Sequence, residues 1–144
     1  MTPFTHLIGR KPFVIGGEDH PYLRRWWIIP RNRFFNVYLH QFLRSDDDRA
    51  LHDHPWFNVS ILVTGRYREW LTEDTFADRV APTIVARSAE TAHRIELTHG
   101  GVWTLFLTGR KVREWGFLCP KGWRHWTVFC NTDDGGATVG RGCE

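Results

Sequence analysis

The sequence predicts an all-β fold, a sandwich or barrel contained in one domain. The chain has 144 residues, a length typical of a single domain. Aromatic residues make up 15% of it, with eight Trp and ten Phe, and such side chains suit the half-buried surface of a pleated sheet. Short apolar or alternating runs recur between Gly, Pro, Asn and Asp, without any long amphipathic helical pattern. Many short strands without intervening helices are typical of sandwiches and barrels.

The runs that carry this pattern predict individual strands. The expected strands are residues 22–29, 34–43, 57–64, 67–72, 83–86, 93–97, 102–108, 112–118 and 126–130. The turn Pro-Arg-Asn-Arg at 30–33 is expected to join the first two into an N-terminal β-hairpin, and Gly65 to form the tight turn after the third. We find no internal repeat and no linker. Residues 1–130 are therefore interpreted as one domain, and the Gly-rich residues 131–144 as a C-terminal tail with little core to bury.

The strand expected at 57–64 has two different faces. One face is entirely apolar, with Phe57, Val59, Ile61 and Val63. The other, extended towards the N-terminus, is mixed, with His52, His54, Trp56, Asn58, Ser60 and Leu62. This pattern favours a barrel wall whose mixed face lines an interior cavity. The apolar face is expected to be covered by the N-terminal hairpin or by a second subunit, so a homodimer is one of two expected coverings.

Charge and cysteine content exclude several classes of function. The net charge of +3 is mild, and the basic residues are interleaved with acids, which argues against a nucleic-acid-binding protein. No apolar run is long enough to suggest a membrane span or a signal peptide. The three cysteines (Cys119, Cys130 and Cys143) show no C-x-x-C spacing. We therefore expect reduced thiols, a cytoplasmic protein and a small-molecule partner.

The strongest chemical signal is the pair His52 and His54. Residues two apart on an extended segment point to the same face, where both imidazoles can reach one ion, whereas Asp53 between them points the other way. Taken alone, the pattern is equally compatible with two surface histidines in a loop.

The wider spacing resembles the first motif of the cupin superfamily, which is H-x-H, three or four residues, Glu, six residues and Gly. Here His52 and His54 are followed by Asn58 and then Gly65. His93 stands where the second cupin motif ends in a histidine. The chain is also similar to short bacterial and phage cupins that have His-Asp-His-Pro-Trp at this point. The resemblance implies a double-stranded β-helix (a jelly-roll barrel) with an N-terminal hairpin, and a metal site made of His52, His54 and His93.

The sequence departs from that pattern at two points. Asn58 takes the place of the usual glutamate ligand, and Ser88 and Glu90 stand where the family has Pro and Gly. Three neutral imidazoles would leave open positions for water, dioxygen or substrate. Cupins without the glutamate resemble three-histidine non-haem iron dioxygenases, so Fe(II) is favoured, although Zn, Ni or Mn also suits three histidines. Loss of the glutamate is equally compatible with a degenerate site that binds metal poorly.

Other side chains are candidates for supporting roles. Asn58 and Glu90 are candidate fourth ligands or partners behind the ligands, with a solvated turn as the alternative for Glu90. His40 is a candidate partner of substrate or ligand, against the alternative of a core histidine. Trp56 and Tyr67 are candidate pocket walls.

Two functional hypotheses follow. In the first, the protein is a metal-dependent enzyme of dioxygenase type, and Arg side chains near the mouth of the barrel receive a small anionic substrate. In the second, it is a non-catalytic or metal-independent cupin that binds a sugar-like small molecule or isomerises it. The sequence does not decide between them, because cupins host many reactions on one scaffold.

Overall fold

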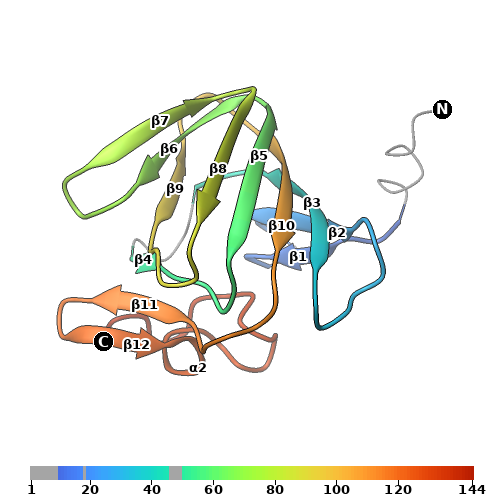
Figure 1. The fold of residues 1–144 in the computed structure, drawn as a ribbon. Coiled ribbons are helices and arrows are strands. Elements are labelled where there is room, and N and C mark those ends of the chain that lie inside the picture. Colours follow the sequence, from blue (N-terminus) through green and yellow to red (C-terminus); the bar gives the residue numbers. More distant parts are fainter. Residues whose placement is uncertain (1–9, 18, 46–49) are drawn as a thin grey trace.

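The computed structural model describes residues 10–17, 19–45 and 50–144. Short antiparallel strands make up nearly all of the regular structure (Figure 1). They are β1 (Phe13–Ile15), β2 (Leu23–Trp27), β3 (Asn36–Phe42), β4 (Leu51–His52), β5 (Asn58–Thr64), β6 (Arg66–Trp70), β7 (Phe76–Val80), β8 (Thr83–Arg87), β9 (Arg94–Leu97), β10 (Val102–Thr108), β11 (Gly116–Cys119) and β12 (Gly122–His125), with one helical turn, α2 (Trp126–Phe129).

The strands form three sheets. The largest has six strands in the order β1-β2-β3-β10-β5-β8, and two sheets of three strands have the orders β12-β11-β4 and β7-β6-β9. Strands far apart in the sequence are neighbours, because β10 pairs with both β3 and β5. In Figure 1, β6, β7 and β9 lie on one side of the six-stranded sheet, and β11 and β12 lie beside its lower end. This is the all-β architecture that the sequence predicts.

The predicted N-terminal hairpin is confirmed, since β2 pairs antiparallel with β3 through the turn at 30–33. It lies within the six-stranded sheet, because β3 pairs with β10 on its other side and β1 pairs with β2 at the edge. The prediction misses β1, β4, β7 and β12. These strands have two to five residues, too few to show a clear alternation of apolar and polar side chains.

The strand predicted at 126–130 is wrong. Trp126–Phe129 forms a single helical turn, α2, closed by a hydrogen bond from the Cys130 N–H to the Trp126 carbonyl at 2.7 Å. At its start, the His125 ring accepts a hydrogen bond from the backbone N–H of Thr127 at 3.2 Å. The side chain of His125 thus caps a helix start, which the apolar run of the sequence does not reveal.

The two faces of β5 lie as the sequence predicts. Asn58, Ser60 and Leu62 point inward and are buried. On the outer face, Phe57 just before the strand is 52% exposed and Val63 is 48% exposed. Among the described residues, the N-terminal hairpin therefore leaves part of the apolar face of β5 exposed. The expectation that the hairpin covers this face is wrong for that part.

The second covering, by another copy of the chain, stays a prediction. Ile84 on β8 lies opposite Ile61 of β5 and is 71% exposed, so the open apolar face continues onto the edge strand. Large apolar patches on soluble proteins commonly mark association surfaces. We expect a dimer in sedimentation velocity at micromolar concentration. A monomer alone at the highest soluble concentration would contradict this prediction.

Side chains from all three sheets line a cavity of about 590 Å³. On one side lies a core cluster of Leu23, Phe42, Leu62, Tyr67, Ile95 and Val102. A second cluster forms where β11 meets the C-terminal segment, and there the Phe117 and Phe129 rings stack at 3.7 Å between centroids. The cavity is thus held between two packed cores. In the part of the chain that the structure describes, no helix is long and apolar enough to cross a membrane.

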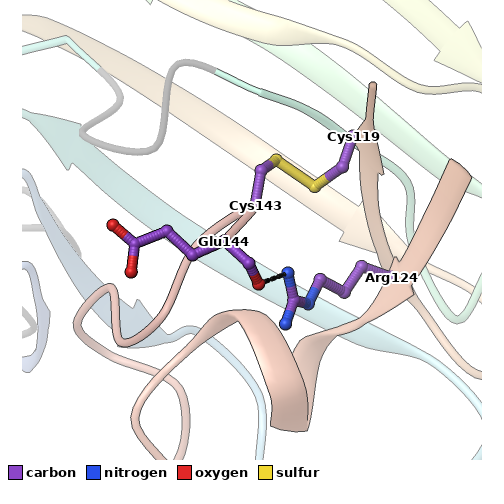
Figure 2. Close-up of a disulfide and its surroundings, with 4 residues drawn as sticks. All are labelled: Cys119, Arg124, Cys143 and Glu144. Carbon is purple, nitrogen blue, oxygen red and sulfur yellow. Dashed lines mark hydrogen bonds between the residues drawn. A yellow bond between two sulfur atoms is a disulfide. The ribbon is translucent and has the colours of Figure 1, made fainter. Parts of the chain in front are cut away.

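The prediction of reduced thiols is wrong for two of the three cysteines. Cys119, at the end of β11, forms a disulfide with Cys143, 24 residues further along the chain (Figure 2). In the same region, Arg124 Nη1 donates a hydrogen bond to the carbonyl oxygen of Glu144 (Figure 2). The third cysteine, Cys130, is buried and does not take part in this disulfide. The sequence does not predict this pairing, because only the tertiary structure brings the C-terminal segment next to the end of β11.

The disulfide fastens a segment that contributes to the cavity wall, since Gly135, Gly136 and Ala137 all line it. We expect the Cys143→Ser variant to be about 2–4 kcal/mol less stable to unfolding than the oxidised parent, because the bond closes a loop of 24 residues. Urea unfolding measures this difference. Adding a reductant should remove it, and an equal difference with and without reductant would show that the serine acts through packing.

Candidate metal centre

Backbone pairing brings His52 and His93 together. The N–H of His52 donates to the His93 carbonyl at 2.9 Å, and the N–H of His93 donates to the His52 carbonyl at 3.0 Å. The two residues therefore form an isolated antiparallel bridge between β4 and the residue before β9. His54 is fixed two residues further on, where its N–H donates to the Ala89 carbonyl at 3.0 Å. All three side chains then face the cavity.

The three imidazoles form a nearly equilateral triangle. Their ring centroids are 5.1 Å apart for His52 and His54, 4.9 Å for His52 and His93, and 5.1 Å for His54 and His93. One ring nitrogen from each lies within 4.8 Å of the others. Small rotations about the side-chain bonds would bring all three nitrogens to one ion at about 2.0–2.1 Å. The arrangement therefore suits a three-histidine metal site.

Asp53 holds the H-x-H segment from behind. It points away from the cavity, as the sequence predicts, and it is buried. One carboxylate oxygen accepts the Gly116 N–H at 2.7 Å, and the other accepts Trp123 Nε1 at 2.9 Å and Arg113 Nη1 at 2.9 Å. Arg113 Nη1 also donates to the His54 carbonyl at 3.1 Å. These contacts tie the segment that carries both histidines to β11 and β12.

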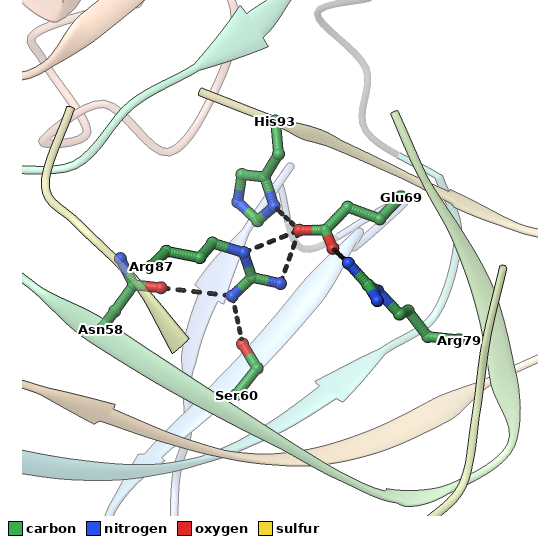
Figure 3. Close-up of polar contacts among 6 residues, drawn as sticks. All are labelled: Asn58, Ser60, Glu69, Arg79, Arg87 and His93. Atoms are coloured by element: carbon green, nitrogen blue, oxygen red, sulfur yellow. Dashed lines mark hydrogen bonds and ion pairs between the residues drawn. The ribbon is translucent and has the colours of Figure 1, made fainter. Parts of the chain in front are cut away.

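Behind His93 lies a buried ionic cluster centred on Glu69 (Figure 3). One oxygen of the Glu69 carboxylate contacts His93 Nδ1 at 2.6 Å and Arg87 Nε at 2.7 Å. The other accepts from Arg79 Nε at 3.1 Å. Arg87 Nη1 also donates to Ser60 Oγ at 2.8 Å and to Asn58 Oδ1 at 3.2 Å.

This cluster sets the state of His93. Burial by itself raises the pKa of Glu69, but the His93 hydrogen bond and the charges of Arg87 and His93 outweigh it and bring the pKa down to about 2. The carboxylate is therefore ionised and can only accept, so Nδ1 of His93 carries the proton that it donates. Nε2 of His93 is then the nitrogen that could bind a metal ion. A carboxylate behind a histidine is the common support of a protein metal ligand.

The His54 imidazole is held neutral. Burial lowers the pKa of His54 well below its usual value, and the charges of His93, His52, Arg87 and Arg25 lower it further. Nδ1 of His54 is buried and has no hydrogen-bond partner among the described residues. Neutral imidazole is the form that binds a metal, so the site favours ligation over protonation.

The structure places two predicted candidates away from the ligand positions. The side-chain oxygen of Asn58 is engaged with Arg87, and its amide donates to the Trp56 carbonyl at 3.4 Å, so Asn58 belongs to the cluster behind His93. Glu90 is exposed in the turn before His93 and is not part of the three-histidine group.

The remaining candidates line the cavity. Trp56 stacks on His54 with 5.5 Å between ring centroids, and Tyr67 is buried in the adjacent core. His40 is buried, stacks on Phe106 at 5.1 Å, and accepts a hydrogen bond from Arg25 Nε at 3.0 Å. His40 is thus near the site but is not a partner of the three ligands in any contact that the structure shows.

Glu69, Arg87 and Arg25 are not among the site residues predicted from the sequence. For Glu69 a signal was present: Tyr67 and Glu69 share one face of a strand whose other face carries Arg66 and Arg68. A carboxylate on the same face as a pocket tyrosine requires a buried partner. The identity of that partner could not be read from the sequence, because Arg87 comes from a strand 18 residues away.

The architecture is similar to solved cupin structures. An RmlC-like cupin protein from Ralstonia eutropha has 16% sequence identity and a TM-score of 0.56, over 85% of this chain and 79% of that chain. A Klebsiella pneumoniae protein with a double-stranded β-helix domain has 10% identity and a TM-score of 0.56, over 73% and 90% of the two chains. The iron(II) form of HppE has 11% identity and a TM-score of 0.58, over 70% and 57%.

These similarities show that the chain has the cupin double-stranded β-helix fold. No protein-family model and no curated protein sequence matches the chain. The likeness of its His-Asp-His-Pro-Trp segment to short bacterial and phage cupins therefore stays a prediction.

Proposed function

We propose that this cupin binds one divalent metal ion through His52, His54 and His93, and that it is an enzyme of dioxygenase type acting on a small anionic molecule. The observation that carries the proposal is the triangle of three imidazoles at the wall of the cavity, with Glu69 hydrogen-bonded to one of them. Three neutral protein ligands leave the ion its full charge and open coordination positions. Fe(II) is the favoured ion, and the similar HppE structure is an iron(II) form.

Different residues of the chain would hold the ion, orient a ligand and line the cavity. His52, His54 and His93 would hold the ion, and Glu69 would keep Nδ1 of His93 protonated so that the ring stays oriented. Trp56 and Phe106 would exclude water from the cavity, since both are aromatic and line it. The ion, when bound, would supply a site at which dioxygen and substrate meet.

Metal analysis of the purified protein tests the first half of the proposal. We expect about one ion per chain in tag-free protein prepared without chelator, and loss of that ion in both His54→Ala and His93→Ala. His54→Ala is the cleaner variant because it leaves the Glu69 cluster intact. His99→Ala, which removes an exposed histidine, should keep the full metal content.

Oxygen consumption tests the second half. Protein loaded anaerobically with Fe(II) should consume dioxygen with a suitable small acid, whereas the His54→Ala variant should not. If the ion bound in the cell is zinc, nickel or manganese, the proposed metal site is supported and the dioxygenase assignment is contradicted. Folded parent protein that binds no metal would contradict both, and would favour the alternative of a metal-independent cupin that binds or isomerises a small molecule.

A further inference from the structure

Arg25 faces the cavity, and no carboxylate of the described residues balances its charge. It lies on β2 opposite His40 of β3, and its guanidinium carbon lies 4.6 Å from the centre of the Tyr38 ring. Within the described residues, its hydrogen-bond partner is Nε2 of His40 and no acid lies within ion-pair distance. Arg68, Arg79, Arg87 and Arg113 each pair with Asp or Glu. An unpaired charge at a cavity wall costs stability, and an acidic ligand in the cavity would supply the partner that the described residues do not.

His40 orients this guanidinium without neutralising it. Because Nε2 accepts the Arg25 hydrogen bond, the His40 ring is neutral and carries its proton on Nδ1. Burial, followed by the charge of Arg25, keeps the pKa of His40 well below its usual value. The bond uses Nε of Arg25, and Nη1 and Nη2 make no hydrogen bond to the described residues. Two such parallel donors match the two oxygens of a carboxylate.

The cavity around Arg25 is cationic and aromatic. Its lining includes the guanidiniums of Arg25 and Arg31 and four imidazoles, and none of its described lining residues is Asp or Glu. The Phe106 ring lies between the two polar groups, with its centroid 5.1 Å from His40 and 6.1 Å from His54. One aromatic ring therefore separates the Arg25–His40 pair from the metal-binding histidines, so that a small molecule can contact both.

We propose that Arg25 binds the carboxylate of a small organic acid, whose apolar body lies against Phe106 and whose other end reaches the three-histidine site. The position of that second end rests on the proposed function, whereas the carboxylate contact at Arg25 does not. The proposal narrows the substrate class from any small anion to a carboxylic acid with an apolar body of a few carbon atoms.

Calorimetric titration with matched acids and amides tests the contact. The probes are phenylacetate against phenylacetamide and butyrate against butyramide, since each pair differs in charge and hardly in shape. We expect at least one acid to bind the parent about tenfold more tightly than its amide. Arg25→Gln should lose this preference, and Arg25→Lys should keep part of it. Arg24→Gln is the matched control, because its side chain contacts Gln41 and does not line the cavity.

Running each titration on protein as purified and on protein treated with EDTA separates this proposal from the metal proposal. A preference for acids that survives EDTA and disappears in Arg25→Gln supports the Arg25 contact even if no metal is found. A preference that persists in Arg25→Gln and disappears with EDTA would place the carboxylate on the ion and overturn the contact, while leaving the metal site intact. Equal affinities for acids and amides in the parent, or no binding of either acid, would also overturn it.

Discussion

Replacing Glu69 by Gln should destabilise the protein by about 3–5 kcal/mol, the cost of breaking a buried ion pair and leaving one charge uncompensated. Glu69 is fully buried and Arg87 nearly so, so that the guanidinium of Arg87 would lose its acid in a place where water cannot replace it. The change is not conservative. Both carboxylate oxygens accept hydrogen bonds, so the amide NH₂ of Gln would face a donor in either orientation.

The same variant should bind metal about 10–100-fold more weakly, because His93 loses the carboxylate that fixes its tautomer and orientation. Urea unfolding and metal titration measure the two effects. Asp78→Asn is the matched control on the neighbouring strand, since its pair with Arg68 is solvent-exposed and should be worth less than about 1 kcal/mol. If Glu69→Gln changed stability no more than Asp78→Asn does, Glu69 would not be essential to the cluster.

Acid should reduce the difference between the parent and Glu69→Gln. The pKa of Glu69 is about 2 in the folded protein, against an ordinary value of 4.5. A carboxyl group with a lowered folded-state pKa stabilises the fold fully above its unfolded pKa, and this contribution is lost as the pH falls through the folded pKa. The stabilities of the two proteins should therefore converge between about pH 4.5 and pH 2, provided that the fold survives.

The three-histidine cluster was predictable from the sequence, whereas the partners that hold Glu69 and Asp53 behind it were not. His52, His54 and His93 could be found because alternation on an extended segment and motif spacing are local properties. The inward face of β5 could be found for the same reason. Glu69 and Arg87 meet across β6 and β8, which lie in different sheets, and Cys119 meets Cys143 through the packing of the C-terminal segment. Contacts of this kind depend on how separate sheets and segments pack against one another. A local sequence pattern does not show which residues meet in that packing.

The other large effect is expected at Asp53, where Asp53→Ala and Asp53→Asn should each cost about 1–3 kcal/mol of stability, since both remove the buried carboxylate that accepts from Gly116, Trp123 and Arg113. Asn should be little better than Ala, although its shape is that of Asp. One oxygen of Asp53 accepts the Gly116 N–H and the other accepts from Trp123 and Arg113, so an amide NH₂ in either position opposes a donor. Asp133→Asn, an exposed control, should leave unfolding unchanged.

The effect of Asp53 variants on metal binding would distinguish Asp53 from an acid that only stabilises the fold. Arg113 Nη1 bridges Asp53 to the His54 carbonyl, and Asp53 lies between two of the three clustered histidines, so its loss should loosen the H-x-H segment itself. We therefore expect weaker metal binding in Asp53→Asn even under conditions where circular dichroism shows that the variant is fully folded. Metal affinity equal to that of the parent in such folded protein would show that the histidines are positioned by their own backbone bonds to His93 and Ala89, without the anchor on β11.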